Sequence, residues 1–394
     1  MYSQMLAQLE KEYPSMVAWR RHFHEHPELS FQEVETPKKI ASFLRELGLE
    51  DVKEGVGGRG VVAKIHGGLP GKTIALRADF DALPIQDAKD VAYKSKVPGV
   101  SHACGHDAHT ATLLHTAKVL YENRADLQGT IVLIHQFAEE QTPGGAKPMI
   151  DDGCLEDVDV VYGTHLWSTF PAGEIFTKSG PLMAASDRFH IQVTGKGGHG
   201  ALPHETRDPI VCGSAIVQSL QQIVSRNVDP LQSAVLSFGA FESGGPFNVI
   251  PDSASILGTV RTFSKDVQTM VKERLSEIAD HTGKAYGTAC TLTYEDGYPA
   301  LLNHEKETNH VQQAARVLFG VDACQEMTPM MGGEDFAYYL LDKPGAFFFT
   351  GAGHPDAFPH HHPHFDIEEK AMLQASKMFI KLIEVSNEEA AADG

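Results

Sequence analysis

Two side chains that can bind metal ions lie one residue apart in the stretch "SHACGHDAH", residues 101–109. They are Cys104 and His106, and a thiolate and an imidazole are good ligands for zinc and similar ions. The pair is a weak signal by itself, because a buried cysteine next to a surface histidine is common. A metal site would need further ligands from other parts of the chain.

Two adjacent acids, Glu139 and Glu140, end the stretch "GTIVLIHQFAEE" directly after an apolar, β-branched run. In α/β sheets, ligands gather at the carboxyl ends of strands. The simpler interpretation is a solvated acidic loop. In the functional interpretation one carboxylate binds a metal ion and the other stays free as a base, because hydrolysis by metal-activated water needs both.

Further candidates follow other strand-like runs. His165 comes just past the strand predicted in "VVYGTHLW", although a lone histidine there is more often a capping or core residue. Asp79 and Asp81 follow the run "TIAL" in "RADFDALP". Either acid could be a metal ligand or could orient a ligating imidazole, and Asp81 is our choice for the orienting role.

Four histidines occupy five positions near the C-terminus, in "FPHHHPHFD", residues 358–366. The cluster could be a metal site, a pH-sensitive surface patch, or a chance grouping in a chain with 21 histidines. Residue types alone leave these three interpretations open.

The middle of the chain offers candidate substrate contacts. His199 lies in the glycine-rich stretch "GKGGHGALPH", where glycines allow close approach of the backbone to a ligand. Asn248 lies in "FNVIPD", and Gly333 lies in "MMGGEDFAYY", where helix capping is the alternative. Arg261, in "GTVRTF", is either a surface arginine or a fork for a carboxylate.

The elements that must position these residues are helices alternating with buried strands. This order predicts an α/β domain with a largely parallel sheet flanked by helices. The expected strands lie within residues 60–67, 72–81, 129–140, 158–167 and 345–353, and the expected helices include 36–48 and 106–127.

The pattern changes after Met183, where alternating strands and two long helices follow in the order β-α-β-β-α-β. This order is typical of a compact ferredoxin-like α+β unit. We therefore expect a catalytic, metal-binding domain of residues 1–183 and 298–394, with a smaller lid and dimerisation domain of residues 184–297 inserted into it.

Composition excludes some classes of partner. The net charge is −19, from 52 acidic and 33 basic residues, which argues against a nucleic-acid or anionic-membrane surface. The start of the chain has no long apolar run, and no stretch approaches a membrane span. The five cysteines are odd in number and scattered, which argues against a disulfide framework and predicts a reducing cytoplasm.

The motifs together resemble the metal-dependent amidohydrolases. The stretches "RRHFHEHPELSFQE", "RADFDALPI", "HACGHDAHTA", "FAEE", "GTHLW", "GKGGHGALPH", "FNVIPD", "GTVRTF", "GGEDFAYY" and "HHPHFDIEE" follow the family order from about residue 19 to 370. The group includes hippurate hydrolases, N-acyl-amino-acid deacylases and auxin-conjugate hydrolases, a branch of the aminoacylase and carboxypeptidase superfamily.

The resemblance implies two divalent metal ions per subunit, either zinc or manganese, nickel or cobalt. It assigns the metal ligands to Cys104, His106, Glu140, His165 and His361. His361 is singled out because family members carry a histidine two residues before a proline and four before an aromatic residue. The resemblance makes Glu139 the general base.

In the lid domain the resemblance makes His199 a transition-state residue, which in related dimers reaches the neighbouring subunit's site. It makes Asn248 and Gly333 substrate contacts and Arg261 the anchor for a carboxylate. A homodimer or homotetramer formed through the lid domain is therefore expected.

The implied reaction is hydrolysis of the amide bond of N-acyl-L-amino acids, such as hippurate-like or N-acetyl compounds, to a carboxylic acid and a free amino acid. A metallocarboxypeptidase or dipeptidase acting on short peptides is the first alternative, since it would use the same metals and anchor. A non-catalytic binding protein on the same scaffold is the second.

Overall fold

The computed structural model describes residues 1–392 and divides the chain into two compact units. The larger unit consists of Met1–Leu182, Leu302–Thr328 and Asp335–Gly394. The smaller unit consists of Met183–Leu301 and Pro329–Glu334. The smaller unit is thus an insertion in the larger one, as the order of elements predicted.

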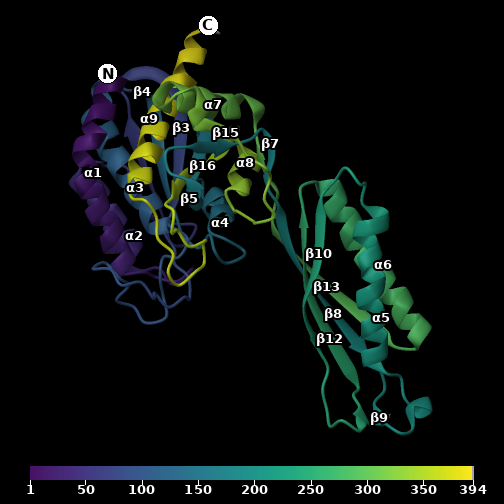
Figure 1. Ribbon diagram of the computed structural model, residues 1–394. Coiled ribbons are helices and arrows are strands. Elements are labelled where there is room, and N and C mark those ends of the chain that lie inside the picture. The colour runs from purple at the N-terminus through teal and green to yellow at the C-terminus, as the bar shows by residue number, and fades with distance from the viewer. Residues whose placement is uncertain (393–394) are drawn as a thin grey trace. The chain divides into compact units, whose positions relative to one another are not determined.

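The larger unit is built on a largely parallel sheet (Figure 1). Its strand order is β1-β2-β4-β3-β5-β16-β6-β15, and the central strands β4, β3, β5 and β16 run parallel to one another. Strand β2 pairs antiparallel with both of its neighbours, β1 and β4, and β6 pairs antiparallel with β16. The strands are β1 (Val52–Val56), β2 (Gly60–His66), β3 (Leu69–Asp79), β4 (Gln128–Gln136), β5 (Val160–Pro171), β6 (Ile175–Thr177), β15 (Cys324–Glu326) and β16 (Gly345–Gly353).

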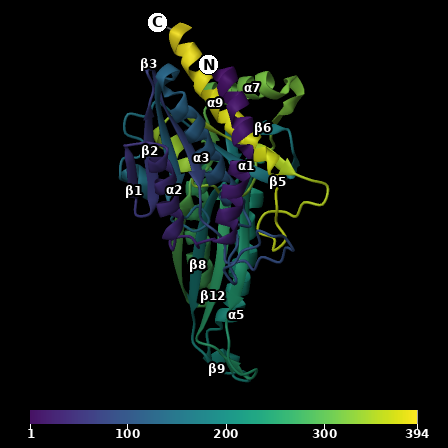
Figure 2. The ribbon, with the colours of Figure 1, turned by 90° about the vertical axis from the view of Figure 1, so that its left-hand side faces the viewer.

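Helices cover the sheet on both faces, which is why the central strands are continuous apolar runs. Helices α3 and α9 contact β3, and α1 packs against both of them (Figure 2). Helix α8 contacts β16 and α4. The helices are α1 (Tyr2–Glu25), α2 (Glu35–Glu46), α3 (His106–Glu122), α4 (Ala146–Asp151), α7 (Glu305–Phe319), α8 (Ala337–Asp342) and α9 (Lys370–Ala392), with short 3-10 turns η1 (Arg124–Asp126) and η4 (Val321–Ala323).

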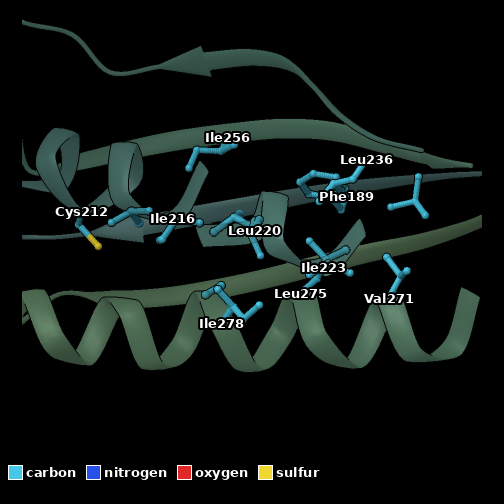
Figure 3. Close-up of a cluster of buried hydrophobic side chains, with 14 of the residues drawn as sticks. Phe189, Cys212, Ile216, Leu220, Ile223, Leu236, Ile256, Val271, Leu275 and Ile278 are labelled. Carbon is cyan, nitrogen blue, oxygen red and sulfur yellow. The ribbon is translucent and has the colours of Figure 1, made fainter. Parts of the chain in front are cut away.

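The smaller unit has the predicted ferredoxin-like arrangement. Its antiparallel sheet has the order β10-β12-β8-β13, and α5 and α6 pack on one face over a core of aliphatic side chains (Figure 3). Alternation of buried and open positions along β8 is the pattern of a strand covered on one side. The elements are β8 (Ala185–Thr194), η2 (Pro203–Glu205), α5 (Pro209–Gln222), η3 (Ile223–Asn227), β10 (Ala234–Glu242), β12 (Ser253–Thr262), α6 (Lys265–Tyr286) and β13 (Ala289–Tyr298).

Short paired segments complete the two units. β7 (Gly180–Met183) pairs with β14 (Leu301–Asn303), and β9 (Gly198–His199) pairs with β11 (Val249–Ile250). The segment Pro329–Glu334 groups with the smaller unit, because the backbone N–H of Ala184 donates to the carbonyl oxygens of Met330 and Gly332. Within residues 1–392, no helix has the length and apolar character needed to cross a bilayer.

Candidate metal centre

Cys104 and His106 are brought together by the turn that starts helix α3. Gly105, between them, has φ of +95°, a left-handed conformation that glycine adopts at little cost. The turn lets Cys104 precede the helix while His106 is its first residue. Both side chains are buried in the larger unit.

The adjacent acids follow β4 at its carboxyl end, as predicted. Ala138 lies between the strand and the acids with φ of +51°, an unusual value for a residue with a side chain. The Glu33 carboxylate accepts a hydrogen bond from the Ala138 N–H at 2.9 Å, and Asp81 accepts one from the Glu140 N–H at 3.0 Å. These contacts fix the backbone that carries Glu139 and Glu140.

His165 lies inside strand β5 rather than just past a strand, because pairing with β16 continues to Pro171. Pairing of β5 with β3 on the other side runs only as far as Gly163. His165 therefore lies where pairing with β3 has already ended while pairing with β16 continues. Its Nε2 atom is 3.3 Å from the Sγ atom of Cys104.

His361 reaches the same place from the loop after β16. Its φ of +64° is again left-handed, and its backbone N–H donates to the carbonyl oxygen of Ala103 at 2.8 Å. This contact ties the loop to the residue next to Cys104. The Nε2 atom of His361 is 3.1 Å from Oε1 of Glu140.

The other histidines of the C-terminal cluster have different surroundings. The ring of His360 stacks on Trp167 at 4.1 Å, and its Nε2 atom is 3.2 Å from the Leu166 carbonyl oxygen. The ring of His362 stacks on Phe358 at 4.4 Å, and His364 lies beside both. Only His361 of the four belongs to a group of potential ligand atoms within the described residues.

Among the described residues, five groups of potential ligands have their ligand atoms within 4.8 Å of one another, and three of these groups contain only the predicted metal ligands and the predicted base. Because the groups share members, their side chains surround one volume in the larger unit. These three groups are Cys104 with His106 and His165, Cys104 with Glu140 and His361, and His106 with Glu139 and Glu140; a further group joins Asp79 with His106 and His109.

The charges of this cluster favour a cation. Burial lowers the pKa of His106, but Asp79, Asp81 and Glu140 outweigh it and raise the pKa to about 10. Burial, followed by the charges of Glu140 and Glu139, raises the pKa of the Cys104 thiol well above its usual range. A proton is thus held where a divalent ion could replace it.

The residues fit a pair of metal ions by the chemistry of their donors. Thiolate, imidazole and carboxylate are the ligand types of zinc and related divalent ions. Burial and the neighbouring rings of His109 and His360 lower the pKa of His165 well below its usual value, so this imidazole is neutral, as ligation requires. The Nε2 atom of His106 is buried with no hydrogen-bond partner among the described residues, as expected of an atom kept for an ion.

The two aspartates of "RADFD" have separate contacts. Asp81 Oδ1 is 3.1 Å from Nδ1 of His106, which is the place of a residue that orients a ligand. Asp79 Oδ1 is instead 2.6 Å from Nδ1 of His109. Sequence reasoning did not single out His109 or Glu33. The spacing of three residues between His106 and His109 was the available signal, since it puts both on one helix face.

The predicted transition-state residue His199 and the three predicted substrate contacts all lie in the smaller unit, in two separate places. His199 pairs with Val249, and the Gly200 N–H donates to the Asn248 carbonyl oxygen at 2.8 Å. The paired strands β9 and β11 precede the first residue of β12, whereas Arg261 pairs with Ser186 near the last residue of β12. Gly333 also packs against Ser186. The ends of β12 are about 30 Å apart by the rise of an extended strand. One copy of this unit therefore does not bring the four residues together.

Comparison with known proteins identifies the family. Residues 75–385 match the model described as "Peptidase family M20/M25/M40". The chain belongs to the M20 family. The predicted resemblance to metal-dependent amidohydrolases and peptidases is confirmed, and the chain is a hydrolytic enzyme.

Relatives within the M20 family cover nearly the whole chain. It is 56% identical over 374 residues to "Putative amidohydrolase YhaA" of Bacillus subtilis (strain 168), covering 94% of each chain. It is 44% identical to the N-acetyl-L-cysteine deacetylase of the same organism, covering 94% of this chain and 87% of that one. A solved structure of the Bacillus subtilis YXEP protein, described as a dinuclear metal binding peptidase, has 37% identity, covers 96% and 99% of the two chains, and has a TM-score of 0.84.

Proposed function

We propose that this enzyme hydrolyses the amide bond of N-acyl-L-amino acids to a carboxylic acid and a free amino acid. The observation that carries the proposal is the convergence of the six potential ligand and base residues on one volume of the larger unit. Two divalent ions would be held there by a set of five residues: Cys104, His106, Glu140, His165 and His361. Zinc suits these donors, and manganese, nickel and cobalt are the other candidates.

Bound divalent ions at such residues lower the pKa of water and polarise a substrate carbonyl group. The protein's own part begins with Glu139, which takes a proton from the attacking water and returns it to the leaving amine. Asp81 orients the His106 ring through their hydrogen bond. His199 donates to the oxyanion that forms as water attacks.

Arg261 is the proposed anchor for the free carboxylate of the amino-acid half. Its guanidinium is half-buried, and within the described residues it has no carboxylate partner. Burial lowers its pKa, although the nearby Asp187 partly opposes this effect. An unpaired and partly desolvated guanidinium binds a carboxylate strongly. Asn248 and Gly333 are the further proposed substrate contacts.

A peptidase acting on short peptides is the alternative function. The support for it is that the family and the YXEP protein are both described as peptidases. The two activities differ in the group on the amide side. A dipeptide places an α-ammonium group close to the scissile bond, where metal ions would repel it. An acetyl or benzoyl group has no such charge, so N-acyl amino acids should be preferred.

A substrate panel tests this preference on enzyme reconstituted with each metal. We expect kcat/KM for hippurate or acetyl-amino acids to exceed that for matched dipeptides by at least about tenfold. Ninhydrin or chromatographic detection of the released amino acid measures both. A preference for dipeptides of the same size would reverse the assignment in favour of the peptidase.

A homodimer formed through the smaller unit is the proposed assembly. It is supported by the separation of His199 and Asn248 from Arg261 and Gly333 within that unit, because a second copy could complete one substrate site with residues of both. The site would then combine Glu139 of one subunit with His199 of its partner.

Mixing two inactive variants tests this assembly. Glu139→Gln and His199→Ala should each be inactive alone. Subunit exchange between them should restore about a quarter of wild-type activity, since half of the dimers become hybrids and each hybrid has one intact site. The assay is turnover after exchange in mild denaturant and refolding. Zero recovery in a sample whose hybrid content is verified by mass spectrometry would refute the shared site.

A further inference from the structure

A backbone hydrogen bond to His109 determines which of its two ring nitrogens carries a proton. The backbone N–H of Leu166 donates to Nε2 of His109 at 2.9 Å. An amide N–H can only donate, so Nε2 carries no proton and the ring proton must be on Nδ1. Nδ1 in turn donates to Oδ1 of Asp79 at 2.6 Å. The ring is thus held at both nitrogens, in one tautomer.

Asp79 is itself held by a buried network. Its second oxygen, Oδ2, accepts a hydrogen bond from Nη1 of Arg77 at 2.7 Å. Arg77 also donates to Gln136 at the end of β4 and to Asp335, each at 2.9 Å. All of these side chains are buried. The His109 ring is therefore anchored to the ends of two central strands and has little freedom to move.

The Leu166 backbone needs a partner at this point. Pairing of β3 with β5 ends at Gly163, three residues before Leu166, so the sheet offers no further strand on that side. On the other side β16 continues, with Thr350 opposite Leu166. An unpaired buried N–H is costly, and the His109 ring satisfies it in place of a strand.

Leu166 also contacts the side chain of His165, the neighbouring proposed metal ligand. Its carbonyl oxygen accepts a hydrogen bond from Nδ1 of His165 at 3.0 Å. That contact leaves Nε2 of His165 as the free lone pair, and Nε2 faces the Sγ atom of Cys104. The N–H of Leu166 is thus held by His109, and its carbonyl group orients the ring of His165.

We propose that His109, held by Asp79, is a positioning residue that sets the Leu166 backbone and through it aims the imidazole of His165 at a metal ion. The inference rests on the proposed metal centre, since it assigns His165 as a ligand. His109 does not contact the ion, because both of its ring nitrogens are already hydrogen-bonded. Its role is to substitute for the missing strand next to β5.

Cobalt binding to three variants tests the proposal. His109→Leu removes the acceptor, and His109→Gln supplies an amide oxygen that can accept from the Leu166 N–H. His115→Leu is the matched control, because His115 is equally buried on α3 and hydrogen-bonds Ala111 and Ser15 instead. Co²⁺ affinities come from chelator competition, and visible absorption bands report the ligand geometry.

We expect His109→Leu to weaken cobalt binding by about 10–100-fold and to shift the visible bands, as loss of a residue that orients a ligand does. His109→Gln should recover part of both, and His115→Leu should match the wild type. Circular dichroism establishes that each variant is folded. If His109→Leu does not fold, Asp79→Asn should give the same loss of affinity.

The outcomes separate the inference from the proposed function. The positioning role would be overturned if the wild type binds two ions and the folded His109 or Asp79 variant shows unchanged cobalt affinity and absorption bands. That result would leave the metal centre intact. Failure of the wild type to bind two ions would overturn the metal centre, and the positioning role with it. An equal loss in His115→Leu would show a general effect of α3 and would also overturn the inference.

Discussion

Replacing Glu139 with glutamine should lower kcat by roughly 10²–10⁴-fold, the usual contribution of a general base, while metal content stays at the wild-type level. Glu139 is buried beside His106 and Glu140 at the carboxyl end of β4. Glutamine has the same shape but cannot take a proton from water. The measurements are steady-state turnover of an N-acyl amino acid and metal analysis of the purified protein.

The neighbouring acid provides the matched control. Glu140→Gln should lower turnover and metal content together, because Glu140 lies between His361 and His106 as a proposed ligand. The contrast between the two variants distinguishes a base from a ligand at adjacent positions. Wild-type turnover in Glu139→Gln would remove Glu139 from the proposed mechanism.

Replacing His361 with alanine should weaken binding of one metal ion by more than about 100-fold. Loss of a direct ligand should exceed the 10–100-fold effect typical of residues that only orient ligands. His361 is 3.1 Å from Glu140, and its N–H is tied to Ala103. The measurement is metal content after dialysis against graded chelator concentrations, followed by turnover of the same samples.

His362 and His364 are the controls for this variant, since they belong to the same short loop. The His362 ring lies parallel to that of Phe358, with an angle of 8° between the planes. Alanine at either position should leave metal content near the wild-type value. Comparable losses in all three variants would mean that the loop as a whole, and not His361, determines metal binding.

Much of the fold followed from local sequence patterns. The buried strand β16 is apolar on both faces, whereas β8, which is covered on one face, alternates between buried and more exposed residues. The spacing of apolar residues along a strand therefore indicates how many of its faces are covered. The same local logic placed Glu139 and Glu140 at the end of β4 and Cys104 and His106 at the start of α3. The order β-α-β-β-α-β then predicted the ferredoxin-like unit.

Other features depended on contacts between distant segments, which no local pattern encodes. The sequence allowed either Asp79 or Asp81 to be a ligand or an orienting residue and favoured Asp81 for the orienting role. The structure places Asp81 beside His106 and Asp79 beside His109. The extension of β5 past His165 depends on β16, almost 200 residues later. The separation of His199 from Arg261 depends on the pairing of β9 with β11, which precedes the first residue of β12, whereas Arg261 lies near the last residue of β12.

The sequence by itself therefore determined the donor types, their places at strand and helix ends, and, through the family resemblance, the choice of His361. The tertiary structure decided how they meet. His361 approaches Cys104 only because its left-handed backbone is bonded to Ala103, more than 250 residues earlier. His165 is oriented through Leu166 because the pairing of β3 with β5 ends at Gly163 and the His109 ring accepts the hydrogen bond of the Leu166 N–H instead. Both arrangements come from hydrogen-bonding needs of buried backbone, which exist only once the chain has folded.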